Sequence, residues 1–285
     1  MSAETFFSLD PWETGNATSL QLDPKHPGLK DVAYVQRREA LFQLARLHRM
    51  QNRPFPRVAY TDAEHALWRN ITEKLTPCHE TKAATLYLKG LRLLNIDRQH
   101  LPQLADLNER LIKSHAIGLA PAEGLLHTRS FYHYLSQRRM PCTLFLRHES
   151  HPEYTPEPDV VHDLIGHVPL LTDHDYADLI ELIGQGVKHA TDAQLEQWGR
   201  IYWFIIEFSL IEEKDDIKVF GAGLLSSYGE MTHAYSDKVK RKPYHLEEML
   251  ETPYDNTQMQ NILFVLPSIP QLQKDIRKLL NTWYG

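Results

Sequence analysis

Two histidines, His162 and His167, are the first side chains in this sequence whose type and spacing could bind a metal ion. They lie in YTPEPDVVHDLIGHVPLL, residues 154–171, where prolines lead up to Asp159, a residue suited to cap the helix that follows. On an ideal helix the two rings would point about 140° apart. Both can reach one ion only if the helix tightens, widens or ends near His167, which Gly166 would permit. By spacing alone, such a pair is more often found among surface or core residues than among ligands.

A third candidate ligand, Glu207, lies forty residues beyond His167. We expect one helix over residues 194–213, because Thr191 and Gln194 can form a capping box and apolar residues recur at three- and four-residue intervals. The helical neighbours of Glu207 are apolar, so no basic residue can pair with it locally. A buried, unpaired carboxylate is costly, and coordinating a cation removes that cost. The alternatives are a salt bridge to a distant arginine and an exposed helix end.

Two imidazoles and one carboxylate, with positions left open, form the ligand set of non-haem Fe(II) oxygenases. The chain around them resembles the tetrahydropterin-dependent aromatic amino acid hydroxylases, whose iron-site signature is close to YTPEPDxxHELLGHxPLL followed by IYWFxxEF. The segment KVFGAGLLSSYGEM and the upstream blocks HPGLKD, PRVAY, LPQLADL and GLAPAEGLLHTRSFYHYL match the same family in the same order. The resemblance therefore runs from about residue 26 to the C-terminal helix.

The pattern of elements predicts a fold that agrees with this family: mostly α with a few short β-strands, in a single catalytic domain of the hydroxylase type. We expect an irregular N-terminal arm over residues 1–25 and an iron- and pterin-dependent catalytic domain over 26–285. Residues 118–126 read as a loop and 238–242 as a solvated charge run. Besides the helix over 194–213, the expected elements are helices over 32–50, from 61 onwards, and over 80–95, 102–114, 128–138, 173–188 and 270–283, with strands over 142–147 and 217–220.

Composition excludes several classes of protein. The chain has 285 residues, 42% of them hydrophobic, and a net charge of −6, which argues against a nucleic-acid-binding protein with its basic stripe. Cys78 and Cys142 are the only cysteines and do not suggest a disulfide framework. No apolar run approaches the ~20 residues of a membrane span, and the N-terminus lacks the basic region of a signal peptide. We expect a soluble, cytoplasmic protein without nucleic-acid or membrane partners.

Animal members of the family carry a regulatory domain before the catalytic core and a tetramerising segment after it. The sequence matches neither of these segments, so the resemblance implies a stand-alone catalytic domain of the bacterial type. We therefore expect a monomer or at most a loose homodimer.

The resemblance implies a definite chemistry. His162, His167 and Glu207 would hold Fe(II), and the iron with a tetrahydropterin would split O2 to give a ferryl Fe(IV)=O species that attacks an aromatic ring. The protein would hold ring, pterin and iron in register. A zinc-dependent hydrolase is the remote alternative, and only Asp163 offers it a general base.

Five residues match the family's substrate positions. Arg147 matches the arginine that binds the substrate carboxylate, for which its planar guanidinium is suited. Thr155 and Ser226 match hydroxyl positions near that carboxylate and the first iron ligand, although both could be turn-capping residues. Pro158 and Trp203 match the walls of the aromatic pocket, although by themselves they would be interpreted as packing residues.

Four residues match the family's pterin positions. Phe131 corresponds to the ring that stacks on the cofactor. Gly124, Leu125 and Leu126 correspond to the loop whose backbone contacts the polar edge of the pterin.

Neighbouring positions depart from the commonest animal pattern. Glu123 replaces a small residue, and His127 and Thr128 replace a pair of serines. Asp163 stands where many members carry a glutamate that contacts the pterin through water. Because aspartate is one methylene shorter, the affinity for the cofactor can differ.

Trp203 also bears on the choice of substrate. Phenylalanine and tyrosine hydroxylases carry tryptophan at this position, whereas tryptophan hydroxylases commonly carry phenylalanine. A bulkier wall favours a smaller ring, so we expect L-phenylalanine to be converted to L-tyrosine. A tryptophan 5-hydroxylase and a phenylalanine meta-hydroxylase stay open, because one methylene-sized change in a pocket alters specificity by only ~1–3 kcal/mol.

Overall fold

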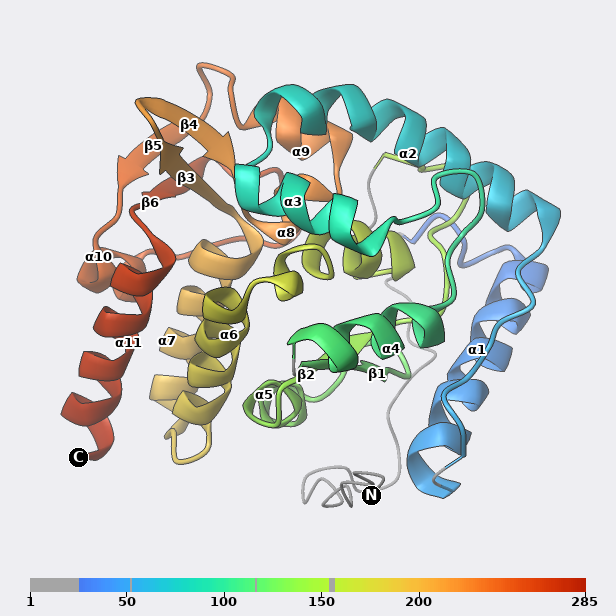
Figure 1. The fold of residues 1–285 in the computed structure, drawn as a ribbon, viewed down its shortest axis with the longest axis horizontal. Coiled ribbons are helices and arrows are strands. Elements are labelled where there is room, and N and C mark those ends of the chain that lie inside the picture. Colours follow the sequence, from blue (N-terminus) through green and yellow to red (C-terminus); the bar gives the residue numbers. More distant parts are fainter. Residues whose placement is uncertain (1–25, 52, 116, 154–156) are drawn as a thin grey trace.

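The computed structural model describes residues 26–51, 53–115, 117–153 and 157–285 (Figure 1). It confirms the predicted fold, mostly α with a few short strands. The arm predicted over residues 1–25 lies outside the described residues, so the division between arm and catalytic domain stays a prediction.

The helices of the N-terminal half follow the predicted pattern. Thr61 and Glu64 form the expected capping box, in which each side chain bonds the other residue's backbone N–H. The helix predicted over 80–95 begins only at Thr85, because the preceding helix continues to Lys82. These elements are α1 (Val32–Gln51), α2 (Asp62–Lys82), α3 (Thr85–Leu94), α4 (Leu104–His115) and α5 (Thr128–Ser136).

The first strands differ from the prediction. β1 (Gly118–Pro121), within the segment predicted as a loop, pairs in parallel with β2 (Arg139–Cys142). A strand over 142–147 is wrong, since β2 ends where that strand should begin. The apolar run after Cys142 is buried by packing and not by strand pairing. The sequence of β1 contains glycine and proline, which are depleted in strands, so it carries no strand signal. Its partner β2 is reached only across α5.

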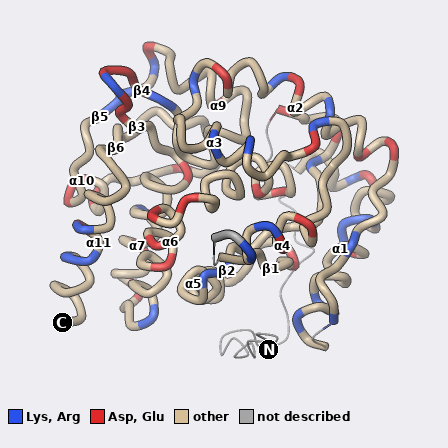
Figure 2. Tube along the Cα trace, in the orientation of Figure 1, with Lys and Arg blue, Asp and Glu red and all other residues tan. Residues whose placement is uncertain are grey.

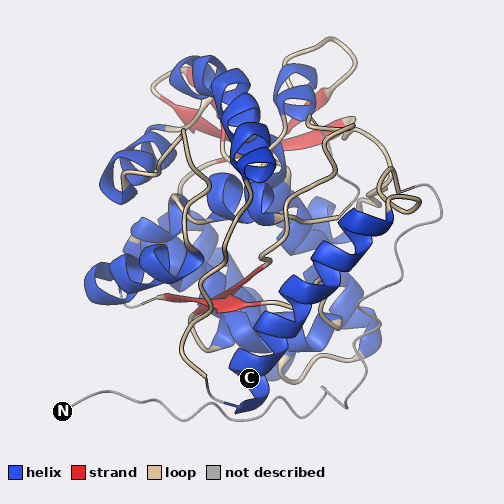
Figure 3. Cartoon of the chain, turned by 90° about the vertical axis from the view of Figure 1, so that its right-hand side faces the viewer, coloured by secondary structure: helices blue, strands red, loops and turns tan. Residues whose placement is uncertain are grey.

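A second sheet, at the opposite end of the molecule from β1 and β2, holds four strands in the order β4-β3-β6-β5 (Figures 1 and 3). The helix predicted over 194–213 is wrong in its last part, because residues 209–213 form a strand. β3 and β4 form an antiparallel hairpin, whereas β6 is parallel to β3 and β5. The strands are β3 (Ser209–Glu213), β4 (Asp216–Val219), β5 (Lys240–Pro243) and β6 (Ile262–Leu266).

The long helices of the C-terminal half lie side by side (Figure 1). α6 packs against α5, α7 and α11, and these helices bury a continuous core that includes Trp198. In the described parts of the chain, no helix is long and apolar enough to cross a membrane. The helices are α6 (His174–Val187), α7 (Asp192–Tyr202), α8 (Ala222–Leu225), α9 (Tyr228–His233), α10 (Leu246–Glu251) and α11 (Ile269–Tyr284).

Two π-helical turns lie at the centre of this fold. The first covers His162–His167, and the second covers Trp203–Glu207 and continues α7. Each has a hydrogen bond over five residues, from the Val168 N–H to the Asp163 carbonyl (3.0 Å) and from the Phe208 N–H to the Trp203 carbonyl (2.8 Å). A helix widened in this way brings residues five apart onto one face.

Helix α8 packs against both π-turns. A Cβ atom added to Gly166 would lie 2.6 Å from the carbonyl oxygen of Ala222, and one added to Gly221 would lie 2.2 Å from that of Glu207. Only glycine permits such close approach of two backbones. The sequence suggested that Gly166 allows a change in winding, but its contact with α8 supplies a more direct reason.

We therefore expect Gly166→Ala to lower the free energy of unfolding by about 1–3 kcal/mol, because the added methyl group must displace the α8 backbone. Gly199→Ala is the matched control. A Cβ there would meet only the Tyr254 hydroxyl at 3.6 Å, and alanine favours the helix by up to about 1 kcal/mol. Chemical denaturation of both variants measures the difference. Equal stability of the two variants would show that the contact with α8 is not tight.

Candidate metal centre and active site

The three predicted metal ligands converge. The two Nε2 atoms of His162 and His167 lie 3.0 Å apart, and they lie 3.4 and 3.1 Å from the Oε2 and Oε1 atoms of Glu207. Among the described residues, this is the one group of three or more His, Cys, Asp or Glu side chains that could hold a metal ion. The π-turn resolves the difficulty of the five-residue spacing, since it places both histidines on the same face.

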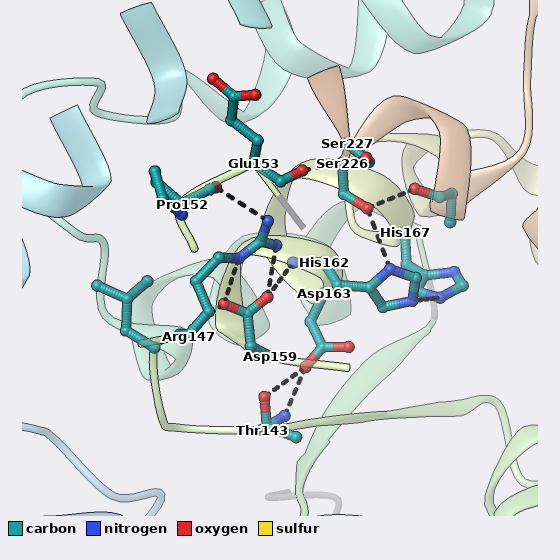
Figure 4. A network of polar contacts seen from close by, with 12 residues as sticks. Thr143, Arg147, Pro152, Glu153, Asp159, His162, Asp163, His167, Ser226 and Ser227 are labelled. Atoms are coloured by element: carbon teal, nitrogen blue, oxygen red, sulfur yellow. Dashed lines mark hydrogen bonds and ion pairs between the residues drawn. The ribbon is translucent and has the colours of Figure 1, made fainter. Parts of the chain in front are cut away.

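The tautomer of His162 follows from its contact with Ser226 (Figure 4). The Ser226 hydroxyl donates its single hydrogen to the Ala222 carbonyl at 2.8 Å, so it must accept at its 3.1 Å contact with Nδ1 of His162. Nδ1 of the ring therefore carries a hydrogen. In the neutral ring, Nε2 then has a free lone pair directed at His167 and Glu207, as metal coordination requires.

Electrostatics at the centre favours a cation. Burial by itself raises the pKa of the Glu207 carboxyl, but the two imidazoles outweigh it and hold that pKa below its ordinary value. Burial likewise lowers the pKa of His162, and the Glu207 charge reverses this, so the pKa is raised. Two nitrogen atoms 3.0 Å apart repel each other unless a proton or cation lies between them. The donor set therefore fits a divalent metal ion.

Arg147 lies beside this centre, held by Asp159 (Figure 4). Nε and Nη2 of the guanidinium donate to the two carboxylate oxygens at 2.9 and 2.8 Å, and both side chains are buried. Asp159 Oδ1 also accepts the His162 backbone N–H at 3.0 Å, which confirms Asp159 as the predicted cap. Burial raises the pKa of Asp159, but Arg147 outweighs it and the pKa is lowered. One carboxylate thus positions both the arginine and the first histidine.

Asp163 has a different environment from the three converging side chains. Its Oδ2 accepts from the backbone N–H and hydroxyl of Thr143 at 2.6 and 2.9 Å. Burial raises its pKa to about 6. Figure 4 shows its carboxylate directed at Thr143, away from the imidazole rings, so the residue that a zinc hydrolase would need as a base is engaged elsewhere.

Trp203 packs against two aromatic rings and donates a hydrogen bond. Its ring lies 4.3 Å from that of Tyr254 at an interplanar angle of 14°, and 4.4 Å from that of Phe208 at 33°. The indole N–H donates to Oε1 of Gln260 at 3.1 Å. Of the other predicted substrate residues, Pro158 is exposed next to Asp159, and Thr155 lies outside the described residues.

Gln260 was not predicted as a site residue, although its side chain links Trp203 to the segment before β6. Its Nε2 donates to the carbonyls of Asp255 and Gln258 at 2.8 and 2.7 Å, so the segment before β6 folds around it. Glu230 lies next to Gln260, and burial raises the pKa of the Glu230 carboxyl to about 7. The sequence carries no signal for Gln260, because its partners come from an irregular segment and from the second π-turn.

Tyr202 is a second residue that sequence reasoning missed. Its ring contacts that of Phe131 edge to face at 5.1 Å and lies 6.5 Å from that of His167. Burial and then the Glu207 charge raise its pKa well above the ordinary value. Tyr202 thus joins the predicted pterin residue Phe131 to the metal centre. The available signal was its position five residues before Glu207. In a π-turn, residues five apart lie on the same face, so this spacing indicates that Tyr202 lies near Glu207.

The predicted pterin loop connects β1 to α5, the helix that carries Phe131. Gly124 has φ +95°, a conformation that favours glycine. Leu125 is 70% exposed, and Leu126 is half-buried. This part of the loop is therefore accessible to a ligand at Leu125, directly after a glycine in the left-handed region.

Comparison with known proteins agrees with this geometry. The sequence profile of the biopterin-dependent aromatic amino acid hydroxylases matches residues 12–283. Rat phenylalanine-4-hydroxylase is 37% identical over 266 residues, which are 92% of this chain and 58% of the rat protein. Tyrosine 3-monooxygenase of Schistosoma mansoni is 33% identical over 266 residues, 92% of this chain and 57% of that protein. The chain thus spans less than two thirds of the length of these relatives.

Solved structures extend the likeness to three dimensions. Phenylalanine hydroxylase from Chromobacterium violaceum, with bound iron(III) and the oxidised cofactor 7,8-dihydrobiopterin, is 32% identical with a TM-score of 0.76. The match covers 81% of this chain and 85% of that one. The phenylalanine hydroxylase of Legionella pneumophila is 28% identical with a TM-score of 0.75, covering 79% and 92% of the two chains. This chain belongs to the family of biopterin-dependent aromatic amino acid hydroxylases.

Proposed function

We propose that this chain is an iron-dependent monooxygenase that converts L-phenylalanine to L-tyrosine with O2 and a tetrahydropterin. The observation that supports this most is the convergence of His162, His167 and Glu207, a ligand set that leaves coordination positions open. When bound, iron and the reduced pterin together supply the activation of O2 and the transfer of an oxygen atom to the ring. Cytoplasmic location and a monomeric or loosely dimeric state stay predictions.

The residues of the chain would each contribute a defined part. His162 and His167 bind the metal through neutral Nε2 atoms, and Ser226 keeps the hydrogen of His162 on Nδ1. Glu207 supplies negative charge that balances the cation in a buried site. All three are held by backbone packing around α8, so they need little rearrangement when the metal binds.

The amino acid would be bound by its carboxylate and by its ring. Arg147 would receive the carboxylate on the edge of its guanidinium that Asp159 does not occupy, and Ser226 and Thr155 stay the predicted hydroxyl positions. Trp203 and Pro158 would form walls of the ring pocket. Asp159 keeps the guanidinium in one orientation and thereby limits the entropy lost on binding.

The pterin would stack on Phe131, with its polar edge against the backbone of residues 124–126. Asp163 would contact it through water with the carboxylate oxygen that Thr143 does not engage. Tyr202 packs between Phe131 and His167, which supports a position for the pterin close to the metal.

The choice of L-phenylalanine depends on the rigid wall formed by Trp203. Tyr254 and Phe208 both pack against the indole, and this close packing resists a turn of the ring that would enlarge the pocket. The similarity to rat phenylalanine-4-hydroxylase supports the same substrate. Tyrosine hydroxylation is the second candidate, because Drosophila melanogaster tyrosine 3-monooxygenase is 36% identical. Tryptophan 5-hydroxylation and phenylalanine meta-hydroxylation are further outcomes for the test.

A product assay tests the proposal. The Fe(II)-loaded protein is incubated anaerobically with tetrahydrobiopterin and equimolar phenylalanine, tyrosine and tryptophan, and O2 is then admitted. We expect L-tyrosine from phenylalanine, coupled to oxidation of the pterin, as measured by mass spectrometry against isomer standards. Dihydroxyphenylalanine, 5-hydroxytryptophan or meta-tyrosine as the main product would overturn the substrate assignment. Absence of any hydroxylated product would contradict the proposed hydroxylation reaction.

Removal of one proposed ligand should abolish metal binding. In Glu207→Ala the two histidines lose their balancing carboxylate, so we expect iron content and hydroxylation to fall to background while the circular dichroism spectrum is unchanged. Glu212→Ala, which removes an exposed carboxylate from β3, is the control and should keep both. Full iron content in Glu207→Ala, measured by inductively coupled plasma mass spectrometry, contradicts the ligand assignment.

Shortening the pocket wall should change the preference between substrates. We expect Trp203→Phe to raise the ratio of kcat/KM for tryptophan to kcat/KM for phenylalanine by about tenfold, because a smaller wall admits a larger ring. Trp283→Phe, which alters an indole packed on Trp198, is the control. A ratio in Trp203→Phe equal to that of the control removes Trp203 as the selective wall.

A further inference from the structure

Glu123 has an unusual environment for a residue at the start of an exposed loop. It is only 3% exposed, whereas Leu125, two residues later, is 70% exposed. A carboxylate is rarely buried to this degree unless other groups compensate its charge. Its partners are therefore informative about the loop.

Two arginines of α1 compensate the Glu123 charge. Arg46 donates from Nε to Oε2 at 2.7 Å, and Arg49 donates from Nε and Nη2 to Oε1 at 3.0 and 2.6 Å. The arginines are three residues apart and so project from one face of the helix. Both carboxylate oxygens are thereby engaged by charged donors, which form the strongest hydrogen bonds in proteins. Figure 2 shows basic residues along α1.

The next residue of the loop also packs on α1. A Cβ added to Gly124 would lie 3.1 Å from Cζ of Phe42, a buried ring one turn before Arg46. The other side of Glu123 is anchored as well, because the Ala122 N–H donates to the Cys142 carbonyl at 2.7 Å. Residues 122–124 are thus held between the β1–β2 pair and α1.

We propose that Glu123 is a positioning residue for cofactor binding, and that its contacts with Arg46 and Arg49, here named the α1 clamp, hold the pterin loop in its binding conformation. This inference rests on the proposed function, in which the backbone of residues 124–126 contacts the pterin. The carboxylate sets the direction in which the chain leaves β1 and hence the orientation of the peptide groups that follow. Glu123 itself does not contact the cofactor.

The clamp acts on the fraction of protein whose loop is ready to bind. The apparent dissociation constant equals the intrinsic constant divided by that fraction, so a loop that is competent about a tenth of the time binds about tenfold more weakly. The α1 clamp therefore affects pterin binding without changing the metal ligands or the pocket for the amino acid. This separates it from a general contribution to stability.

The test compares Glu123→Gln with the wild-type protein. The iron-loaded chain is titrated with 7,8-dihydrobiopterin by isothermal calorimetry, and KM is measured for tetrahydrobiopterin and for phenylalanine. We expect the dissociation constant and the pterin KM to rise about tenfold, with the phenylalanine KM and the kcat at saturating pterin unchanged. Hydrogen exchange in peptides covering residues 122–127 should become faster in the absence of any cofactor.

Two further sets of variants define the clamp. Arg46→Gln combined with Arg49→Gln should reproduce the effect, and adding Glu123→Gln to this pair should have little further effect, because all three residues act as one unit. Arg37→Gln is the matched control, since it breaks a different ion pair of α1, with Glu64 on α2. We expect it to leave pterin binding and loop exchange unchanged.

The outcomes distinguish this inference from the proposed function. If the wild-type protein binds dihydrobiopterin and Glu123→Gln binds it equally well, the clamp is wrong while the proposed function stands. Equal increases in the pterin and phenylalanine KM would also overturn it, as they indicate a general structural role. If the wild-type protein does not bind the pterin, the proposed function fails and the positioning role fails with it. Should Glu123→Gln not fold, Arg46→Gln gives the same measurements.

Discussion

The structure depends above all on the contact of helix α8 with the two π-turns. Backbone meets backbone there, at Gly166 against Ala222 and at Gly221 against Glu207. Because neither contact includes a side chain on the glycine side, neither can adjust by a change of rotamer. The two segments that carry the three converging ligands are therefore held at one separation, although Glu207 lies forty positions beyond His167 in the sequence. A metal site assembled in this way is largely formed before the metal arrives.

A continuous polar network extends from this contact to the proposed substrate site. Ser226, directly after α8, contacts His162, whose backbone N–H is capped by Asp159, which in turn holds Arg147 (Figure 4). Each buried charge in this chain of contacts has a partner of opposite charge or a hydrogen bond, as burial requires. The residue proposed to bind the amino acid and the first proposed metal ligand thus share one carboxylate, which fixes their positions relative to each other.

Local signals were sufficient for much of the fold and failed where pairing is non-local. The capping boxes at Thr61 and Thr191 begin helices as expected, because both partners lie within four residues. β1 was assigned to a loop, since its partner β2 is reached only across α5, and β3 was assigned to a helix, since β6, one of its two partners, is reached only through a long connection. The end of the helical run at Glu207 likewise depends on the pairing of β3 with β4 and β6. Such pairings depend on the whole fold and leave little trace in local periodicity.

The sequence by itself determined which chemical groups are present: two imidazoles, a carboxylate and an arginine beside them, in an order specific enough to indicate the family. It also determined where several helices start, because caps are local. Only the tertiary structure decided how the helices wind around the ligands. An α-helix would separate His162 from His167 by about 140°, and the π-turn that brings them together is stabilised by its packing against α8. The surroundings of Tyr202, Gln260 and Glu123 were decided in the same way, because their partners lie on other elements and a side chain's neighbours are a property of the packed chain.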